Sequence, residues 1–214
     1  MKTLSKIHGP VRERGVVLLF CLIILVVLLA GGVAVMRSMD TSLVGAGNIA
    51  FKRDLVNQGE LAIAKAMQEF QTSGALAATS VTANNLPAAN YSAIQLATNA
   101  QGIPEVLLKK TNLTGPDVVG NAFTPTGTPI SGSGGATVRY VIDRMCNATG
   151  AFSVIGKSGC VYTPSSTETL GGDQSQLATP GPSVPSPPLY RVSVRVDGPR
   201  DTQVFLQASF TKPE

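Results

Sequence analysis

The hydrophobic pattern begins with one long apolar run. Residues 16–36 read VVLLFCLIILVVLLAGGVAVM, which is 21 residues without a charge, and fifteen of them are Val, Leu, Ile or Phe. About 20 apolar residues at 1.5 Å per residue cross a hydrocarbon core of about 30 Å, so the run predicts a membrane-spanning helix. Lys and Arg gather before the run, whereas Arg37 and Asp40 balance each other after it. The positive-inside rule therefore predicts a cytoplasmic N-terminus and an extracytoplasmic remainder.

Two simpler interpretations compete for this run. A cleaved secretory signal peptide has a shorter apolar region, about 7–15 residues long, followed by small residues. The present run is longer, although residues 30–34 (AGGVA) are small. A plain single-pass membrane anchor fits the hydropathy equally well. The residues that flank the run must therefore distinguish between these interpretations.

The apolar pattern continues beyond the run at helical spacing. Ile49, Val56, Ile63 and Phe70 recur every seven residues, with further apolar residues at 55, 62, 66 and 67. The stripe predicts one helix from Val16 to about Phe70, about 80 Å long. We expect its first half to face lipid or neighbouring helices and its second half to pack against a folded domain.

The C-terminal part alternates apolar and polar residues at 138–143, 190–197 and 204–210. This period predicts three strands of a sheet with one buried face. The turn residues Asp197-Gly198-Pro199-Arg200 predict that the last two strands form an antiparallel hairpin. Residues 114–135 and 163–188 are rich in Gly and Pro and predict loops, and residues 73–110 predict loop with short helix. The predicted fold class is α+β, a long N-terminal helix followed by an antiparallel sheet domain with long loops.

Most of the net charge lies at the N-terminus. The 214 residues carry a formal charge of +4, of which Lys2, Lys6, Arg12 and Arg14 against Glu13 contribute +3. The rest of the chain is nearly neutral and lacks the basic footprint of a nucleic-acid-binding protein. The single histidine, at position 8, lies in the same segment. Removal of this segment would leave no imidazole for a catalytic triad, a Cys-His dyad or a His-containing metal site.

The residues at the start of the apolar run resemble a known leader. Arg12-Glu13-Arg14-Gly15 abuts the run without a spacer, as in the short, basic type III leaders of type IV pilins and pseudopilins, which are cut after a Gly. The continuation is similar to the N-terminal region of PilX-type minor pilins, with RGVVLL at 14–19, LLAGGVAVMRS at 28–38 and AGN at 46–48. The resemblance covers residues 12–70, and YRVSVRVDGPRDT at 190–202 adds a weaker match.

The resemblance implies a processing site and an unusual mature N-terminus. Cleavage between Gly15 and Val16 by a prepilin peptidase would make Val16 the first mature residue. The fifth mature residue would be Phe20, where most pilins carry Glu. PilX-like minor pilins and the type II secretion pseudopilin of the GspK kind share this absence, which favours a minor subunit over a major one.

The implied function is structural, that of a minor pilin that helps to prime pilus assembly and sits at or near the tip. The implied partners are other minor pilins and the major pilin through the N-terminal helix, the prepilin peptidase and the inner-membrane assembly platform; a surface ligand is left open. The implied location is the inner membrane, with a single span and a periplasmic head, and then the pilus. The implied segments are a cleaved leader (1–15), the membrane half of the helix (16–36), its periplasmic continuation (37–72) and a globular head (73–214).

Three alternatives remain open. A type II secretion pseudopilin has the same general design. A single-pass anchored adhesin or other binding protein would use the N-terminal helix only as a tether. An anchored enzyme is the third alternative.

The three cysteines fall in two regions. Cys21 lies in the apolar run and cannot reach the others. Cys146 and Cys160 are fourteen residues apart in the part expected outside the cytoplasm, where disulfides form and persist. A bridge between them would be worth about 3 kcal/mol in the chain-entropy model. The alternative is a pair of unrelated buried thiols.

One segment loosely matches a phosphate-binding loop. AFSVIGKS at 151–158 has P-loop spacing with Ala in place of the first Gly, but GCVYTP after it predicts no helix whose N-terminus could bind an anion. We interpret the match as a coincidence. N-x-S/T triplets, the acceptor pattern for N-glycosylation, begin at Asn90, Asn112 and Asn147. In a bacterial host, as the leader suggests, we expect these to be ordinary loop asparagines. We expect no catalytic site, no metal, no cofactor and no enzymatic activity.

Overall fold

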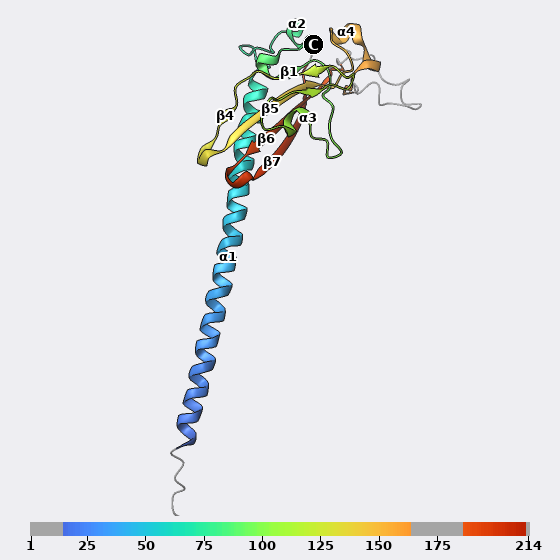
Figure 1. Cartoon of the computed structure of the whole chain (residues 1–214). Helices are drawn as coiled ribbons and strands as arrows, with labels where there is room; N and C mark the ends of the chain where they lie inside the picture. The colour runs from blue at the N-terminus through green and yellow to red at the C-terminus, as the bar shows by residue number, and fades with distance from the viewer. Residues whose placement is uncertain (1–14, 164–185, 213–214) are drawn as a thin grey trace, which may run out of the picture. The chain divides into compact units, whose positions relative to one another are not determined.

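The structure is a computed structural model and describes residues 15–163 and 186–212. The chain divides into two compact units, Met1–Phe51 and Lys52–Glu214. Helix α1 (Val16–Gln68) contributes residues to both units and is labelled in Figure 1. The predicted long helix is therefore present. It ends two residues before the expected Phe70.

The end of α1 is fixed by its sequence. The backbone N–H groups of Glu69, Phe70 and Gln71 each bond to a carbonyl three residues earlier, which tightens the last turn. The chain then folds back, and the N–H of Leu76 bonds to the carbonyl oxygen of Glu69 at 2.8 Å. A Cβ at Gly74 would lie 2.2 Å from that same oxygen, so only glycine fits there.

The second unit is built on a mixed sheet in the order β1-β5-β6-β7, with β4 also paired to β5 (Figure 1). Its long strands are β5 (Thr137–Arg144), β6 (Leu189–Asp197) and β7 (Gln203–Thr211). All three were predicted, and the antiparallel hairpin of β6 and β7 is confirmed, with Val194 opposite Leu206. The predicted α+β fold class is thus confirmed.

The short helices expected within residues 73–110 are present, whereas the short strands were not predicted. Residues 114–135, expected as a loop, contain three two-residue strands, and residues 73–110 contain a parallel partner of β5. Strands this short carry no alternation, so the sequence pattern cannot reveal them. The bounds are α2 (Thr79–Thr82), η1 (Pro87–Ala89), β1 (Tyr91–Ser92), α3 (Glu105–Leu108), β2 (Gly115–Pro116), β3 (Ala122–Phe123), β4 (Ile130–Ser131), η2 (Ser133–Gly135), α4 (Phe152–Ile155), η3 (Lys157–Gly159) and η5 (Pro199–Asp201). The predicted loop at 163–188 lies largely outside the described residues.

One face of the sheet packs on the part of α1 that belongs to the second unit. Leu55, Ala62 and Ala66 are almost fully buried, as the helical stripe predicted. Beyond the helix end, Phe70 makes edge contacts with the rings of Tyr91, Tyr190 and Phe210, the shortest at 4.9 Å between centroids. Each such pair adds about 0.5–1.5 kcal/mol beyond the apolar area that it buries.

Gly59 allows α1 to approach the sheet closely. A Cβ at this position would lie 2.5 Å from Cδ1 of Leu206 and 3.2 Å from Cγ2 of Val196. We expect Gly59→Leu to lower the stability of the second unit by roughly 1–3 kcal/mol, because it overpacks this contact. Thermal unfolding of the full chain in detergent measures the loss. Gly47→Ala is the matched control, since its Cβ meets nothing within 4 Å. Equal stability of the two variants would contradict the close approach.

The opposite face of the sheet is also covered, and here the prediction of one buried face is wrong. Seven consecutive residues of β6, from Tyr190 to Val196, are buried. A cluster formed by Leu96, Val106, Leu107, Phe123 and Val141 lies on this second face. The charged residues assigned to a solvated face instead find buried partners, because the connecting segments fold over them.

Candidate functional site

The apolar part of α1 in the first unit is the largest candidate interaction surface. Every residue from 16 to 50 is exposed, and the most apolar stretch has no buried residue. The helix is long and apolar enough to cross a membrane. Full burial of a Val, Leu, Ile or Phe side chain is worth about 1.5–3 kcal/mol, so this surface strongly favours an apolar environment.

The predicted cleavage point lies at the very start of this helix. Gly15 is exposed and not helical, and α1 begins at the next residue, Val16. The carbonyl of Gly15 accepts a hydrogen bond from the Leu19 N–H at 3.4 Å. Phe20 lies in the second turn with 58% of its surface exposed. The leader itself falls on residues outside the described part, and cleavage stays a prediction.

Two residues just after the apolar run donate their hydroxyl groups to backbone carbonyls one turn earlier in the helix. Thr41 Oγ1 donates to the carbonyl of Arg37 at 2.9 Å, and Ser42 Oγ donates to that of Ser38 at 3.0 Å. A hydroxyl satisfied in this way can face an apolar neighbour at little cost. The surface available for contact thus extends beyond residue 36. Cys21 is exposed and not bridged.

The second candidate feature is the loop closed by the disulfide between Cys146 and Cys160, which was predicted and is present. Backbone hydrogen bonds flank it on both sides, from Asn147 N–H to the Gly159 carbonyl and from Val161 N–H to the Met145 carbonyl. The two strands of the loop therefore meet in a short ladder, so the bridge joins segments that are already aligned.

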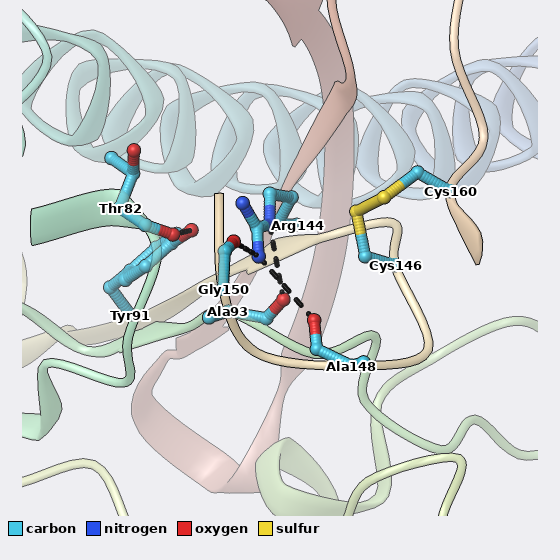
Figure 2. Close-up of a disulfide and its surroundings, with 8 residues drawn as sticks. All are labelled: Thr82, Tyr91, Ala93, Arg144, Cys146, Ala148, Gly150 and Cys160. Carbon is cyan, nitrogen blue, oxygen red and sulfur yellow. Dashed lines mark hydrogen bonds between the residues drawn. A yellow bond between two sulfur atoms is a disulfide. The ribbon is translucent and has the colours of Figure 1, made fainter. Parts of the chain in front are cut away.

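Arg144 holds the first half of this loop, as Figure 2 shows. The side chain is fully buried, and its Nε donates to the Ala93 carbonyl at 3.2 Å. One terminal nitrogen donates to the carbonyls of Gly150, at 2.8 Å, and Ala148, at 3.4 Å. The loop is thereby tied to the residue that follows β1. This role of Arg144 was not predictable, because a lone Arg at a strand end has no recognisable sequence pattern.

We expect Cys146→Ser or Cys160→Ser to lower the free energy of unfolding by about 3 kcal/mol and to lower the abundance of the protein. Cys21→Ser is the matched control and should be nearly silent, since Cys21 is exposed on the first unit and unbridged. Thermal unfolding with and without reductant measures the difference. Alkylation of both Cys146 and Cys160 in unreduced exported protein would refute the bridge.

The segment with P-loop spacing has the wrong architecture for a phosphate site. Helix α4 is only four residues long, and Gly156 follows it with φ 75°. Nζ of Lys157 lies 5.2 Å from the ring centre of Tyr162. No strand leads into the segment and no long helix leaves it among the described residues, which agrees with its interpretation as a coincidence.

The buried charges of the sheet form a network that the sequence pattern does not predict. Asp143 is fully buried, and Arg191 donates to both of its carboxylate oxygens, with Nε at 3.0 Å from Oδ1. Arg191 also donates to the carbonyl of Leu96, whose N–H donates to Asp143 at 2.9 Å. Burial raises the pKa of Asp143 above its ordinary value, and the hydrogen bonds and charge of Arg191 offset this only in part. This network is best explained as structural.

Arg195 forms a second link of the same kind. It is 1% exposed and donates to the carbonyls of Leu107 and Leu108 at 2.8 and 2.9 Å. Oδ1 of Asp197 lies 2.7 Å from Nη2 of Arg195 and balances its charge. These bonds dock α3 on the second face of the sheet.

No group of three or more residues suited to metal binding occurs within residues 15–163 and 186–212. In comparisons with known proteins, no family model, no curated protein and no solved structure matches the chain. The architecture nevertheless agrees with the expectation from sequence. A long N-terminal apolar helix followed by a β-sheet domain with one disulfide is a pilin-like architecture.

Proposed function

We propose that this chain is a structural minor pilin of the PilX-like kind, which helps to prime type IV pilus assembly and sits at or near the pilus tip. The observation that carries the proposal is the full exposure of the apolar run at residues 16–36, within a helix that is exposed throughout residues 16–50. Such a surface needs lipid around it before assembly and other helices around it afterwards. A filament built from subunits with similar helices provides both environments in turn.

The sequence before the helix supports a pilin rather than a plain anchor. A simple anchor needs only hydropathy, whereas the basic segment ending in Gly15 directly before the apolar run matches a type III leader. In our proposal the chain enters the inner membrane with its N-terminus in the cytoplasm. The prepilin peptidase cuts the bond between Gly15 and Val16, and the assembly platform then moves the subunit into the filament.

Phe20 supports a place at the end of the filament. In pilins the fifth-position Glu is thought to neutralise the N-terminal amine of the neighbouring subunit already in the filament. An amine buried among apolar helices is costly unless it is paired, and a buried carboxylate without its amine is equally costly. A subunit that enters first meets no such amine. Phe20 avoids the unpaired charge and adds apolar contact, so we propose entry first or among the first.

A type II secretion pseudopilin is the nearest alternative and would use the same helix. An anchored adhesin or other binding protein differs at the leader, because it would keep residues 1–15. An anchored enzyme would in addition need a catalytic constellation in the second unit. The pilin proposal accounts for both the leader and Phe20, which the two anchor alternatives leave unexplained.

The copy number in purified filaments tests the proposed position. We expect a few copies per filament, with immunogold label at one end, and we expect Phe20→Glu to be neutral or harmful and never to improve incorporation. Phe20→Leu is the matched control, because it keeps an apolar residue and should retain incorporation. Label spread evenly along the shaft would end the tip proposal, and absence from pili would end the pilus proposal itself.

A further inference from the structure

The second unit contains a cleft, lined by both polar and apolar side chains, that the proposed pilus function does not use. It has a volume of about 380 Å³ and lies between the last turns of α1, the η1–β1 segment and residues 127–128, with Tyr140 of β5 in its wall. This volume falls in the usual range of small-molecule sites, about 300–1,000 Å³. Its small apolar lining comes from Ala75, Leu86, Ala88 and Ala89.

Two deeply buried side chains offer unused hydrogen-bonding groups to this cleft. Tyr140 is 8% exposed and Asn90 is 5% exposed, and both line it. Asn90 Oδ1 accepts from the Gly127 N–H at 2.9 Å, whereas its Nδ2 has no partner within residues 15–163 and 186–212. The Tyr140 hydroxyl likewise has no hydrogen-bond partner in that part of the chain. Neither atom is fully enclosed by protein, and both residues line the cleft, so the two groups can donate to an acceptor on a ligand there.

The position of Asn90 is fixed by the surrounding backbone. Its φ is 55°, a left-handed conformation that Asn tolerates better than most residues. Its carbonyl accepts from the Ile142 N–H at 2.8 Å, and its own N–H donates to the Pro87 carbonyl at 3.0 Å. The amide is therefore held in one orientation before any ligand arrives.

Two opposite charges complete the cleft. Lys65, in the last turn of α1, and Glu69, just after its end, line the cleft, and no ion pair joins them among the described residues. Glu69 Oε2 accepts from the Ala75 N–H at 3.2 Å, which orients the carboxylate. Burial and the negative charge of Glu69 raise the pKa of Tyr140, so the hydroxyl stays protonated at neutral pH. The cleft thus offers three donors (Asn90 Nδ2, the Tyr140 hydroxyl and the Lys65 ammonium) and one carboxylate.

This pattern matches a ligand that carries a carboxylate and an ammonium group close together. A simple anion would be repelled by Glu69, and a simple cation by Lys65. A neutral saccharide would leave both charges without a partner of opposite sign. The short apolar lining leaves room for a small hydrocarbon group beside the two charges.

We propose that this cleft binds a free α-amino acid with a short apolar side chain, its carboxylate facing Asn90 and Tyr140 and its ammonium facing Glu69. The proposal concerns the second unit alone and does not depend on the pilus function. Binding requires no movement of Asn90, because its amide is already oriented.

Titration of the full chain in detergent micelles with L-valine tests the proposal, with isothermal calorimetry as the readout. We expect binding with a Kd of about 1 mM or tighter. N-acetyl-L-valine, which lacks the ammonium, and L-valinamide, which lacks the carboxylate, should each bind at least about tenfold more weakly. No binding of L-valine up to about ten times that Kd, or equal binding of all three compounds, would overturn the proposal.

Three substitutions assign the groups. Tyr140→Phe removes only the hydroxyl, and Asn90→Asp keeps the acceptor for Gly127 while replacing the amide donor by a charge that repels the ligand. Both should weaken binding of L-valine about tenfold or more, and Glu69→Gln should weaken binding of L-valine but not of N-acetyl-L-valine. Tyr162→Phe, near the disulfide, is the matched control and should leave the Kd unchanged. Unchanged affinity for L-valine in Tyr140→Phe and Asn90→Asp would overturn the assignment of these groups. N-acetyl-L-valine and L-valinamide test the same assignment on the unsubstituted chain.

Discussion

Replacing Gly15 by leucine is expected to leave the chain unprocessed and held in the inner membrane. The bond after Gly15 lies at the start of α1, and a type III leader requires a small residue at this position. A side chain at position 15 meets nothing within 4 Å in the described chain, so the fold itself has no reason to change. The expected effect is therefore a near-complete loss of the mature form with unchanged stability of the second unit.

Immunoblots of membrane and pilus fractions measure this effect. Gly15→Ala is the matched control, because a small residue should still permit cleavage. Mature protein in normal amounts from Gly15→Leu would contradict the leader assignment. A loss of total protein in both variants would instead indicate a folding defect and contradict the absence of neighbours around a side chain at position 15.

The largest expected change in stability follows from Arg191→Met. The substitution leaves the carboxylate of Asp143 buried with backbone donors only, the N–H of Leu96 and its own N–H. Removing one partner of a buried ion pair typically costs about 3–5 kcal/mol. Lys110→Met is the matched control, because it breaks the exposed pair with Asp201 and should change stability little.

The pH dependence separates an unpaired charge from lost packing. Loss of Arg191 should raise the pKa of Asp143 further above its unfolded value. The folded state then binds a proton more tightly than the unfolded state, so stability is greatest below the unfolded pKa and falls as pH rises through the folded pKa. The deficit of Arg191→Met relative to the wild type should shrink at low pH. A deficit that is constant with pH, or one not reduced by adding Asp143→Asn, would contradict the role of the buried charge.

The long elements were predictable because each carries its own repeating signal. The apolar residues at helical spacing predict the continuation of α1 beyond the membrane run, although the residues that it buries are Leu55, Ala62 and Ala66 beside the heptad positions rather than the heptad positions themselves. Period-2 alternation predicts β5, β6 and β7. The second buried face was not predictable, because Arg191 and Arg195 have the local pattern of solvated residues. Their partners, Asp143 and the carbonyls of Leu107 and Leu108, lie 48, 88 and 87 positions away in sequence. Only the tertiary fold brings these groups together.

The candidate sites likewise differ in whether they could be predicted from the sequence. The disulfide could be predicted from compartment and spacing, because only two cysteines lie outside the apolar run. The cleft at Tyr140 could not, since its groups come from α1, η1–β1, residues 127–128 and β5 and share no motif. The leader depends on a resemblance in sequence alone, and its test is chemical rather than structural.

The N-terminus of the mature protein tests the central claim most directly. Intact-mass measurement and N-terminal sequencing of the chain from membrane and pilus fractions determine where it begins. The proposed function predicts Val16 as the first residue in cells that contain the prepilin peptidase, and an intact leader in cells that lack it. A chain that still begins at Met1 in peptidase-competent cells would contradict the assignment as a pilin.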